Sequence, residues 1–141
     1  MKRKRKNNDV TLSEIVENEI KLNGLRQGFS KALTKFSEKL KYKNSIQHCD
    51  LTNIPFVTID GEDSKDFDDA VWSECNKEKT KIMIAIADVS FYVEKGDLID
   101  VEAKKRGNSF YFPNKVIPML PEELSNDLCS LVPKKKRKSV V

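Results

Sequence analysis

Six carboxylates within ten residues form the densest group of chemically useful side chains in this sequence: Asp60, Glu62, Asp63, Asp66, Asp68 and Asp69. Like charges held this close repel, unless some carboxylates are protonated or a cation lies among them. Carboxylate oxygens are the usual ligands of hard ions such as Mg²⁺ and Ca²⁺. The segment therefore indicates either a solvated acidic loop or a site for a hard cation.

The spacing of this segment excludes a twelve-residue calcium loop. Such a loop started at Asp60 needs glycine at its sixth position and glutamate at its twelfth, where Lys65 and Val71 stand. A magnesium site that handles phosphate fits better, because Mg²⁺ is often held by few carboxylates and completes its shell with water and phosphate oxygens. Asp66 and Asp68 are expected on one side of an extended chain. The residues alone leave the solvated loop and the magnesium site open.

The elements around this loop predict an α+β fold, with helices first and a mixed sheet with short helices after them. A capping box at Thr11–Glu14 opens a first helix that ends near Asn23. One apolar stripe over 25–40 predicts a second, core-facing helix. Strands are expected over 56–59, 67–72, 82–87 (buried on both faces) and 110–112, and short helices over 100–106 and 122–126.

Charge is distributed unevenly along the 141 residues, which provide room for one domain. The net charge is +4, but ten of the 26 basic residues lie in two runs at 2–6 and 134–138. We expect a disordered basic tail over 1–10, a helical lead-in over 11–50 and a basic C-terminal end over 134–141. Both basic runs could bind polyanions.

The composition excludes several classes of protein. No apolar run approaches the ~20 residues of a membrane helix, so no membrane is expected as a partner. The basic N-terminus lacks the apolar stretch of a signal peptide. Three widely spaced cysteines without a C-x-x-C motif indicate a reducing compartment. We therefore expect a cytoplasmic protein.

Four segments together resemble the RNase II/RNase R (RNB) exoribonuclease family. The segment Thr58-Ile-Asp-Gly-Glu-Asp-Ser-Lys-Asp-Phe-Asp-Asp-Ala-Val71 is similar to the family signature. Segments 85–93, 106–113 and 117–131 follow in the family's order. The resemblance covers about 51–133, is closest to the bacterial RNase R branch, and implies the N-terminal portion of an RNB-type catalytic domain.

This resemblance implies Mg²⁺-dependent hydrolysis of RNA from its 3′ end, releasing nucleoside 5′-monophosphates. Carried over to this sequence, Asp60, Asp66 and Asp69 resemble the family's metal-associated aspartates. Asp68 resembles the catalytic aspartate near the scissile end of the RNA, and Tyr111 the aromatic residue that stacks on the terminal base. A flat ring accepts any base without reading its edge. The alternative for Tyr111 is a core aromatic, but strand alternation places it opposite its two phenylalanine neighbours.

Other candidate residues are less specific. Asp88 could line the same cavity or cap the strand before it, and Arg106 could meet phosphate or sit as a cation at a helix C-terminus. His48 and Cys49 could form a nucleophile pair, although a solvated pair in a polar linker explains them better. With no other histidine, a Ser-His-Asp site elsewhere is excluded.

The rest of the family's catalytic domain, including a later active-site arginine, has no match in this sequence. The expectation is a truncated RNase R-like enzyme that binds the 3′ end of single-stranded RNA. The sequence leaves open whether this chain is active by itself. A second polypeptide that supplies the missing half of the catalytic domain is a candidate partner. The alternative is a non-catalytic RNA-binding or adaptor fragment that acts through its basic tails.

Overall fold

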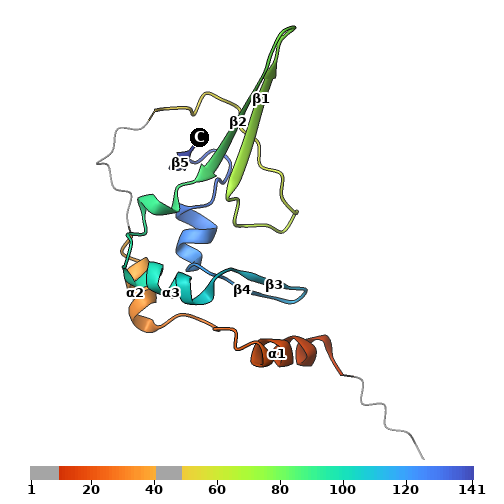
Figure 1. The fold of residues 1–141 in the computed structure, drawn as a ribbon, viewed down its shortest axis with the longest axis vertical. Coiled ribbons are helices and arrows are strands. Elements are labelled where there is room, and N and C mark those ends of the chain that lie inside the picture. The colour runs from red at the N-terminus through yellow and green to blue at the C-terminus, as the bar shows by residue number, and fades with distance from the viewer. Residues whose placement is uncertain (1–9, 41–48) are drawn as a thin grey trace, which may run out of the picture.

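The computed structural model describes residues 10–40 and 49–141, so the expectations for the N-terminal basic run and for His48 fall outside it. A long hairpin of β1 (Asp69–Cys75) and β2 (Thr80–Ala87) projects at one end of the molecule. Helix α1 (Leu12–Leu22) lies across the opposite end (Figure 1). The carboxylate segment leads directly into β1.

Helix α1 begins as the sequence predicts. The Thr11 hydroxyl accepts from the Glu14 N–H, and the Glu14 carboxylate accepts from the Thr11 N–H, which completes the capping box. The buried side chains of Val16 and Ile20 pack on Ile117 at the end of a small hairpin. That hairpin consists of β3 (Phe110–Phe112) and β4 (Lys115–Ile117). Its outward face is thereby fixed relative to α1.

The single helix predicted over 25–40 is wrong, because only α2 (Lys31–Ser37) is helical. Gly28 has a φ of +63°, a left-handed conformation that no helix continues through. Ser30 then caps a new helix by accepting from the Leu33 N–H at 3.2 Å. The prediction that the apolar stripe faces the core is confirmed, since its phenylalanines and leucines are buried or half-buried.

The main sheet has the order β1-β2-β5, where β5 is Ser139–Val140, and both of its pairings are antiparallel. The predicted strand over 56–59 is reduced to one bridge, in which Val57 and Val71 exchange two hydrogen bonds. The strand predicted over 67–72 is present as β1, which begins two residues later and ends three residues later. Because β5 pairs with β2, the C-terminal basic segment leads into a strand of the sheet.

Strand β2 is not buried on both faces as the apolar run predicts. Ile82, Ile84 and Ile86 are 65%, 52% and 47% exposed, whereas Ala85 and Ala87 on the other face are buried. A continuous apolar run predicts a central strand of a sheet. In the structure its second face is open to solvent, so β2 carries an exposed apolar row.

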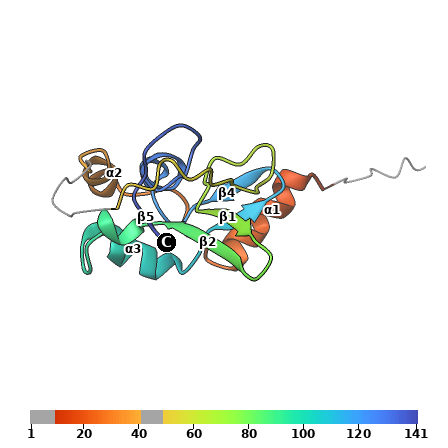
Figure 2. The ribbon, with the colours of Figure 1, turned by 90° about the horizontal axis from the view of Figure 1, so that it is seen from above.

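The main core lies beneath the hairpin, between three further helices and α2. These are η1 (Val89–Phe91), α3 (Leu98–Arg106) and the short helix η2 (Leu124–Leu128). Seen from above, α2 and α3 lie on one side of the molecule and α1 on the other (Figure 2). The buried core residues are Leu33, Ala87, Phe91, Tyr92, Ile99, Leu124 and Cys129.

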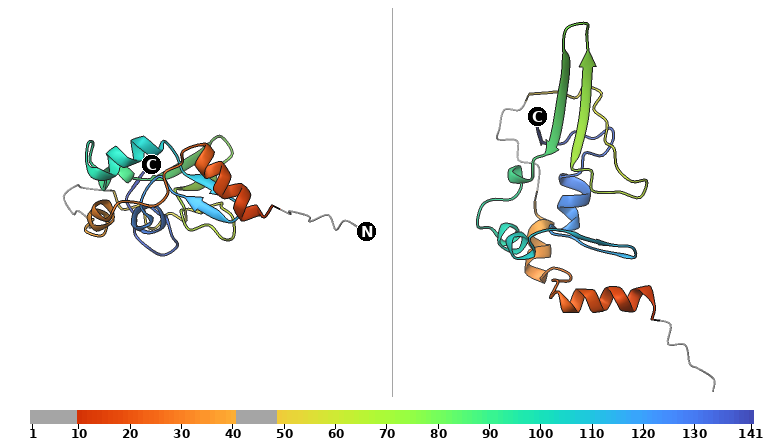
Figure 3. Two further views of the ribbon diagram at one scale, coloured as in Figure 1. Left: turned by 90° about the horizontal axis from the view of Figure 1, so that it is seen from below. Right: turned by 45° about the vertical axis from the view of Figure 1, so that its right-hand side comes forward.

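Helices packed beside antiparallel hairpins confirm the α+β class, and Figure 3 shows the same arrangement from two further sides. Helix α3 begins two residues before the expected position because Asp97 caps it. The helical turn expected near 122–126 appears as η2. Within 10–40 and 49–141, no helix is both long and apolar enough to cross a membrane.

Candidate functional site

The acidic loop ahead of β1 is anchored by one buried serine. The Ser130 hydroxyl donates to the carbonyl of Lys65 at 2.7 Å and accepts from the N–H of Phe67 at 3.1 Å. The N–H of Leu131 donates to the carbonyl of Phe67 at 2.7 Å. These bonds hold the backbone on both sides of Asp66, so this carboxylate is positioned by a residue 64 places later in the sequence.

Tyr111 and Asp66 meet in the structure. The Tyr111 hydroxyl donates to Oδ2 of Asp66 at 2.5 Å, although the two residues are 45 positions apart. Phe110 and Phe112 pack against the core on the inner face of β3, while Tyr111 is 64% exposed on the outer face. The predicted alternation of β3 is confirmed, which leaves the ring of Tyr111 accessible to a base.

The electrostatic surroundings of Tyr111 are negative. Its hydrogen bond to Asp66 is the main reason that the pKa of the phenol lies above its ordinary value, followed by partial burial and the charge of Asp66. The charge of Asp68 raises this pKa further, which places Asp68 within electrostatic reach of the same hydroxyl. The structure thus joins Tyr111 to Asp66, with the charge of Asp68 nearby.

Asp68 and Asp69 are held where the loop enters β1. The N–H of Ala87 donates to the Asp68 carbonyl at 2.8 Å, and Asp69 is paired with Ile86. Residues that lie directly opposite each other in an antiparallel pair point to the same face, so Asp69 shares the exposed apolar face with Ile86. Both aspartates are exposed. The backbone that carries them is therefore hydrogen-bonded to β2, while both residues are exposed.

Among the described residues, no three carboxylate, histidine or cysteine side chains are arranged to hold a metal ion. Asp60 lies in the exposed part of the loop and is not brought into one group with Asp66 and Asp69. The donor chemistry suits Mg²⁺, because carboxylate oxygens are what this ion binds. The aspartates thus have the right ligand atoms for Mg²⁺, but the described residues do not arrange three of them around one point.

The less specific candidates have structural roles. Asp88 caps η1, the helix that follows it, by accepting from the N–H of Phe91 at 3.1 Å, whereas the sequence predicted a cavity residue or a cap of the preceding strand. The Arg106 side chain is 3% exposed, pairs with Glu102 at 3.0 Å and donates to backbone carbonyls, so it is not available to phosphate. Cys49 is exposed, and its neighbour His48 lies outside the described residues.

Sequence reasoning missed Ser130. It belongs to the fourth resembling segment, but nothing local assigns a role to its hydroxyl. The available signal was a serine between Cys129 and Leu131 in an otherwise apolar stretch, because a buried hydroxyl requires a hydrogen-bond partner. That partner is the acidic loop.

A family model described as the RNB domain matches residues 48–141. Ribonuclease R of Vibrio parahaemolyticus is 47% identical over 116 residues, which is 82% of this chain and 14% of that protein. Ribonuclease R of Escherichia coli K12 is 46% identical over 118 residues, which is again 82% of this chain and 14% of that protein. Ribonuclease R of Acidithiobacillus ferrooxidans is 52% identical over 101 residues, which is 72% of this chain and 23% of that protein. The chain thus spans less than a quarter of the length of these relatives.

Two solved structures of Mycoplasma genitalium RNase R have the same fold over 94% of this chain. The complex with double-stranded RNA matches with a TM-score of 0.85 and 36% identity, over 24% of that protein. The complex with ribose-methylated single-stranded RNA matches with a TM-score of 0.84 and 37% identity, over 21%. Because the family model covers more than half of the sequence and the likeness extends through the fold, this chain belongs to the RNB family of ribonucleases.

Proposed function

We propose that this chain contributes the acidic half of the active site of a 3′-5′ exoribonuclease that releases nucleoside 5′-monophosphates. The observation that supports this most is the contact between Tyr111 and Asp66 beside Asp68. It brings an exposed aromatic ring and two carboxylates together from separate segments. The ring would stack on the terminal base, and Asp68 would act at the scissile phosphate.

We propose Mg²⁺ as the cofactor, held by Asp60, Asp66 and Asp69. Bound there, the ion would polarise the phosphodiester and activate a water. Mg²⁺ commonly takes only one or two carboxylates and fills its shell with water and phosphate oxygens. The lack of a three-ligand cluster in the described residues therefore predicts weak metal binding without RNA.

Groups outside this sequence are proposed to complete the site, on the same polypeptide or on a second one. The support is the apolar row of β2, where Ile82, Ile84 and Ile86 remain about half exposed or more. Monomeric proteins rarely leave such rows open, and they commonly mark contact surfaces. A partner segment packed on this face would lie beside Asp69, which shares it.

A cytoplasmic location fits this proposal. All three cysteines are free, and Cys75 and Cys129 show no disulfide partner among the described residues. Free thiols are typical of a reducing compartment.

A cleavage assay tests the proposed activity. The chain is incubated with 5′-labelled single-stranded RNA, with Mg²⁺ or with EDTA, beside Asp68→Asn. Because the remaining groups of the site are proposed to lie outside this sequence, the chain alone is expected to cleave slowly or not at all, and any stepwise shortening from the 3′ end should require Mg²⁺ and be lost in Asp68→Asn. The matched control is Asp63→Asn, which removes the same charge from an exposed position of the same loop and should retain activity.

A chimera removes the dependence on groups outside this sequence. Residues 48–141 replace their counterpart in Escherichia coli ribonuclease R, and the assay is repeated with and without Asp68→Asn. We expect an active chimera that Asp68→Asn silences. A folded chimera without activity, or one that Asp68→Asn leaves active, would overturn the proposed function.

A further inference from the structure

Arg137 is a largely buried arginine in the C-terminal basic segment (residues 134–138). Its side chain is 14% exposed, its Nε donates to the Ser130 carbonyl at 3.0 Å, and its Nη2 donates to Asp127 at 2.5 Å. The guanidinium stays charged in proteins, and a hydrogen bond from a charged donor is stronger than one between neutral groups. Arg137 therefore fixes the turn that follows η2 at two points.

The Ser130 carbonyl belongs to a peptide unit that also contacts the acidic loop. The N–H of this unit is the amide of Leu131, which donates to the Phe67 carbonyl at 2.7 Å. A trans peptide is planar, and its C=O and N–H point in opposite directions. Arg137 thus holds one end of the unit while the acidic loop holds the other. Hydrogen bonds in such a chain polarise one another, so the bond from Arg137 strengthens the bond to Phe67.

The Phe67 carbonyl belongs in turn to the peptide unit that leads into Asp68. The bond from the Leu131 N–H therefore holds the backbone immediately before Asp68. The Ala87 N–H donates to the Asp68 carbonyl at 2.8 Å and holds the backbone immediately after it. Two hydrogen bonds thus set the orientation of this residue, and the first of them is linked to Arg137.

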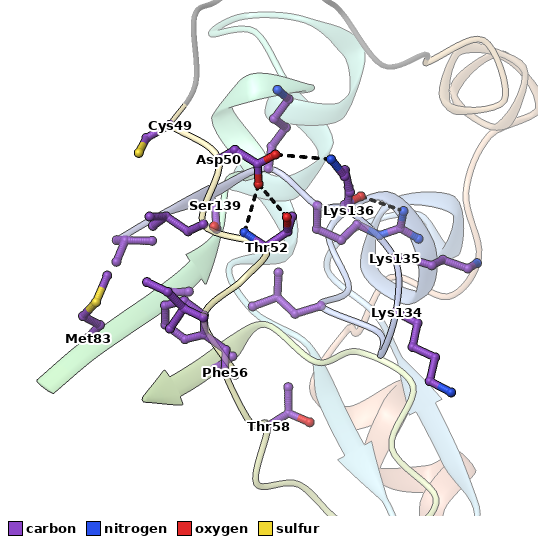
Figure 4. Close-up of a pocket in the computed structure, with 18 residues that line it drawn as sticks. Cys49, Asp50, Thr52, Phe56, Thr58, Met83, Lys134, Lys135, Lys136 and Ser139 are labelled. Atoms are coloured by element: carbon purple, nitrogen blue, oxygen red, sulfur yellow. Dashed lines mark hydrogen bonds and ion pairs between the residues drawn. The ribbon is translucent and has the colours of Figure 1, made fainter. Parts of the chain in front are cut away.

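Both neighbours of Arg137 are tied to the rest of the fold. Figure 4 shows Lys136 turned toward Asp50, with which it forms an exposed ion pair at 3.3 Å. On the other side, the Asp88 N–H donates to the Lys138 carbonyl at 2.9 Å, and β5 follows directly. The backbone that carries the guanidinium is therefore fixed relative to the acidic loop.

A purely structural role of Arg137 is the alternative. A cation just beyond the end of a helix stabilises the last carbonyls of that helix, and Arg137 lies near the end of η2. Such a cap would stabilise the whole fold without a particular effect on the acidic loop. The geometry favours a second role, because the carbonyl that accepts from Arg137 lies outside η2, in the peptide unit that donates to Phe67.

We propose that Arg137 is a positioning residue for Asp68 and acts through the peptide unit between Ser130 and Leu131. The role of Asp68 at the scissile phosphate rests on the proposed function. Arg137 itself contacts neither the metal nor the RNA. It restricts the backbone before Asp68, so that the carboxylate is already oriented when the substrate binds.

Amide hydrogen exchange tests this link without any catalysis. The full chain is compared with Arg137→Gln by NMR, and the exchange rate of the Leu131 amide is divided by that of the Val71 amide. The Val71 N–H donates to the Val57 carbonyl at 2.8 Å, a pairing in which Arg137 takes no part, so the ratio cancels a general loss of stability. The ratio should rise by at least about tenfold, because a charge-assisted hydrogen bond is lost.

Arg106→Gln is the matched control for the loss of a buried arginine. The carbonyls that accept from Arg106 belong to Arg26, Gly28 and Pro118, and none of them lies in the acidic loop. The exchange ratio should therefore stay within about twofold of that of the unaltered chain. An unchanged ratio in Arg137→Gln, or an equal rise in Arg106→Gln, would overturn the proposal.

Two further variants separate the contacts that Arg137 makes. Asp127→Asn keeps an acceptor oxygen at a side chain that is 60% exposed, so the ratio should stay within about twofold. Arg137→Lys keeps the charge but not the planar fork, so the ratio should rise less than in Arg137→Gln. If Arg137→Gln does not fold, Arg137→Lys takes its place, with an expected rise of about threefold.

Cleavage by the chimera tests the consequence for Asp68, since every contact of Arg137 named above lies within residues 48–141. Arg137→Gln should lower kcat by about tenfold or more and leave KM within about twofold, because the groups that bind RNA remain while the reacting group is misplaced. Asp127→Asn should change neither value by more than about twofold. An unchanged kcat in a folded Arg137→Gln chimera would assign Arg137 to stability alone and overturn the proposal.

The two measurements distinguish failure of this proposal from failure of the proposed function. A chimera that stays active in Asp68→Asn would count against the proposed function, and a raised exchange ratio in Arg137→Gln would still support the link to the acidic loop. A chimera that Asp68→Asn silences, with an unchanged exchange ratio in Arg137→Gln, would keep the proposed function and overturn the role of Arg137.

Discussion

The hydroxyl of Tyr111 donates to Oδ2 of Asp66 at 2.5 Å, which joins the outer face of β3 to the acidic loop. The two residues have competing roles in the proposed site. Asp66 cannot give Oδ2 fully to a metal ion while it accepts this hydrogen bond, and the ring cannot turn freely onto a base. Binding of RNA and Mg²⁺ is therefore expected to break the bond.

Two substitutions of Tyr111 distinguish the contribution of its ring to RNA binding from that of its hydroxyl. Tyr111→Ala should weaken binding of the RNA 3′ end by about 1–3 kcal/mol, because the stacking surface is lost. Tyr111→Phe keeps the ring and removes only the hydrogen bond, so its affinity should equal or exceed that of the unaltered chain. Titration of a short labelled RNA in EDTA measures both. A phenylalanine variant as weak as the alanine variant would contradict stacking.

The Tyr111 hydrogen bond should also be visible in alkaline titration. The pKa of Tyr111 is raised by Asp66, by partial burial and by Asp68, so its phenolate should appear at higher pH than that of free tyrosine. A raised pKa in the folded state stabilises the fold below the unfolded value near ~10, and this contribution is lost as pH rises through the folded value. Ultraviolet difference spectra follow the ionisation. Asp66→Asn should move it to lower pH, and an unmoved transition would refute the contact.

Ser130→Ala tests the anchor of the acidic loop. The change leaves the Lys65 carbonyl and the Phe67 N–H without their partner, which should cost about 1–3 kcal/mol of unfolding free energy. Urea denaturation measures this, and cleavage in the chimera should fall as Asp66 loses its position. Ser73→Ala, at an exposed serine of β1, is the control and should change neither quantity.

Arg106 is expected to matter for stability and not for catalysis. Its buried guanidinium pairs with Glu102, donates to the carbonyls of Arg26, Gly28 and Pro118, and lies 3.9 Å from the ring centre of Phe29. Arg106→Ala should cost about 1–3 kcal/mol, because backbone carbonyls lose their donor, while Glu102 keeps its pair with Arg26.

Arg106→Lys should recover only part of that loss, because an ammonium cannot reproduce the planar fork. The comparison is Lys104→Ala, whose exposed pair with Asp100 should contribute less than about 1 kcal/mol. Urea denaturation reports all three variants. Equal stability of Arg106→Ala and Lys104→Ala would be inconsistent with the buried network.

The cysteines should differ in reactivity. Burial, followed by the charge of Asp88, raises the pKa of the Cys129 thiol to about 12, so almost no thiolate forms at pH 8. Cys49 and Cys75 are exposed. The thiols of Cys49 and Cys75 should react quickly with a disulfide reagent in the native protein, whereas the thiol of Cys129 should react only after denaturation. Three fast thiols would contradict the burial of Cys129.

Features that depend on neighbours in the sequence were predictable. The capping box at Thr11 and Glu14 needs only two residues three positions apart, and the exposure of Tyr111 between two half-buried phenylalanines follows from strand alternation. The position of the acidic loop was also predictable from six acidic residues in ten, although the residues alone left a solvated loop and a cation site open.

Features that depend on what packs where were not predictable. The run from Ile82 to Ala87 is equally apolar whether one face or both are covered, and the structure leaves one face open. The stripe from Leu25 to Leu40 has helical spacing, yet Gly28 and Ser30 break it, since local capping and a left-handed glycine outweigh periodicity.

The amino-acid sequence by itself determined the chemistry that this protein carries: the carboxylates, the aromatic ring and the basic run. Only the tertiary structure decided which of them meet. Tyr111 reaches Asp66, Ser130 holds the loop, and Lys134–Lys138 line a groove because the chain brings separate segments together. Such contacts result from burying a shared core, and no spacing along the chain specifies them.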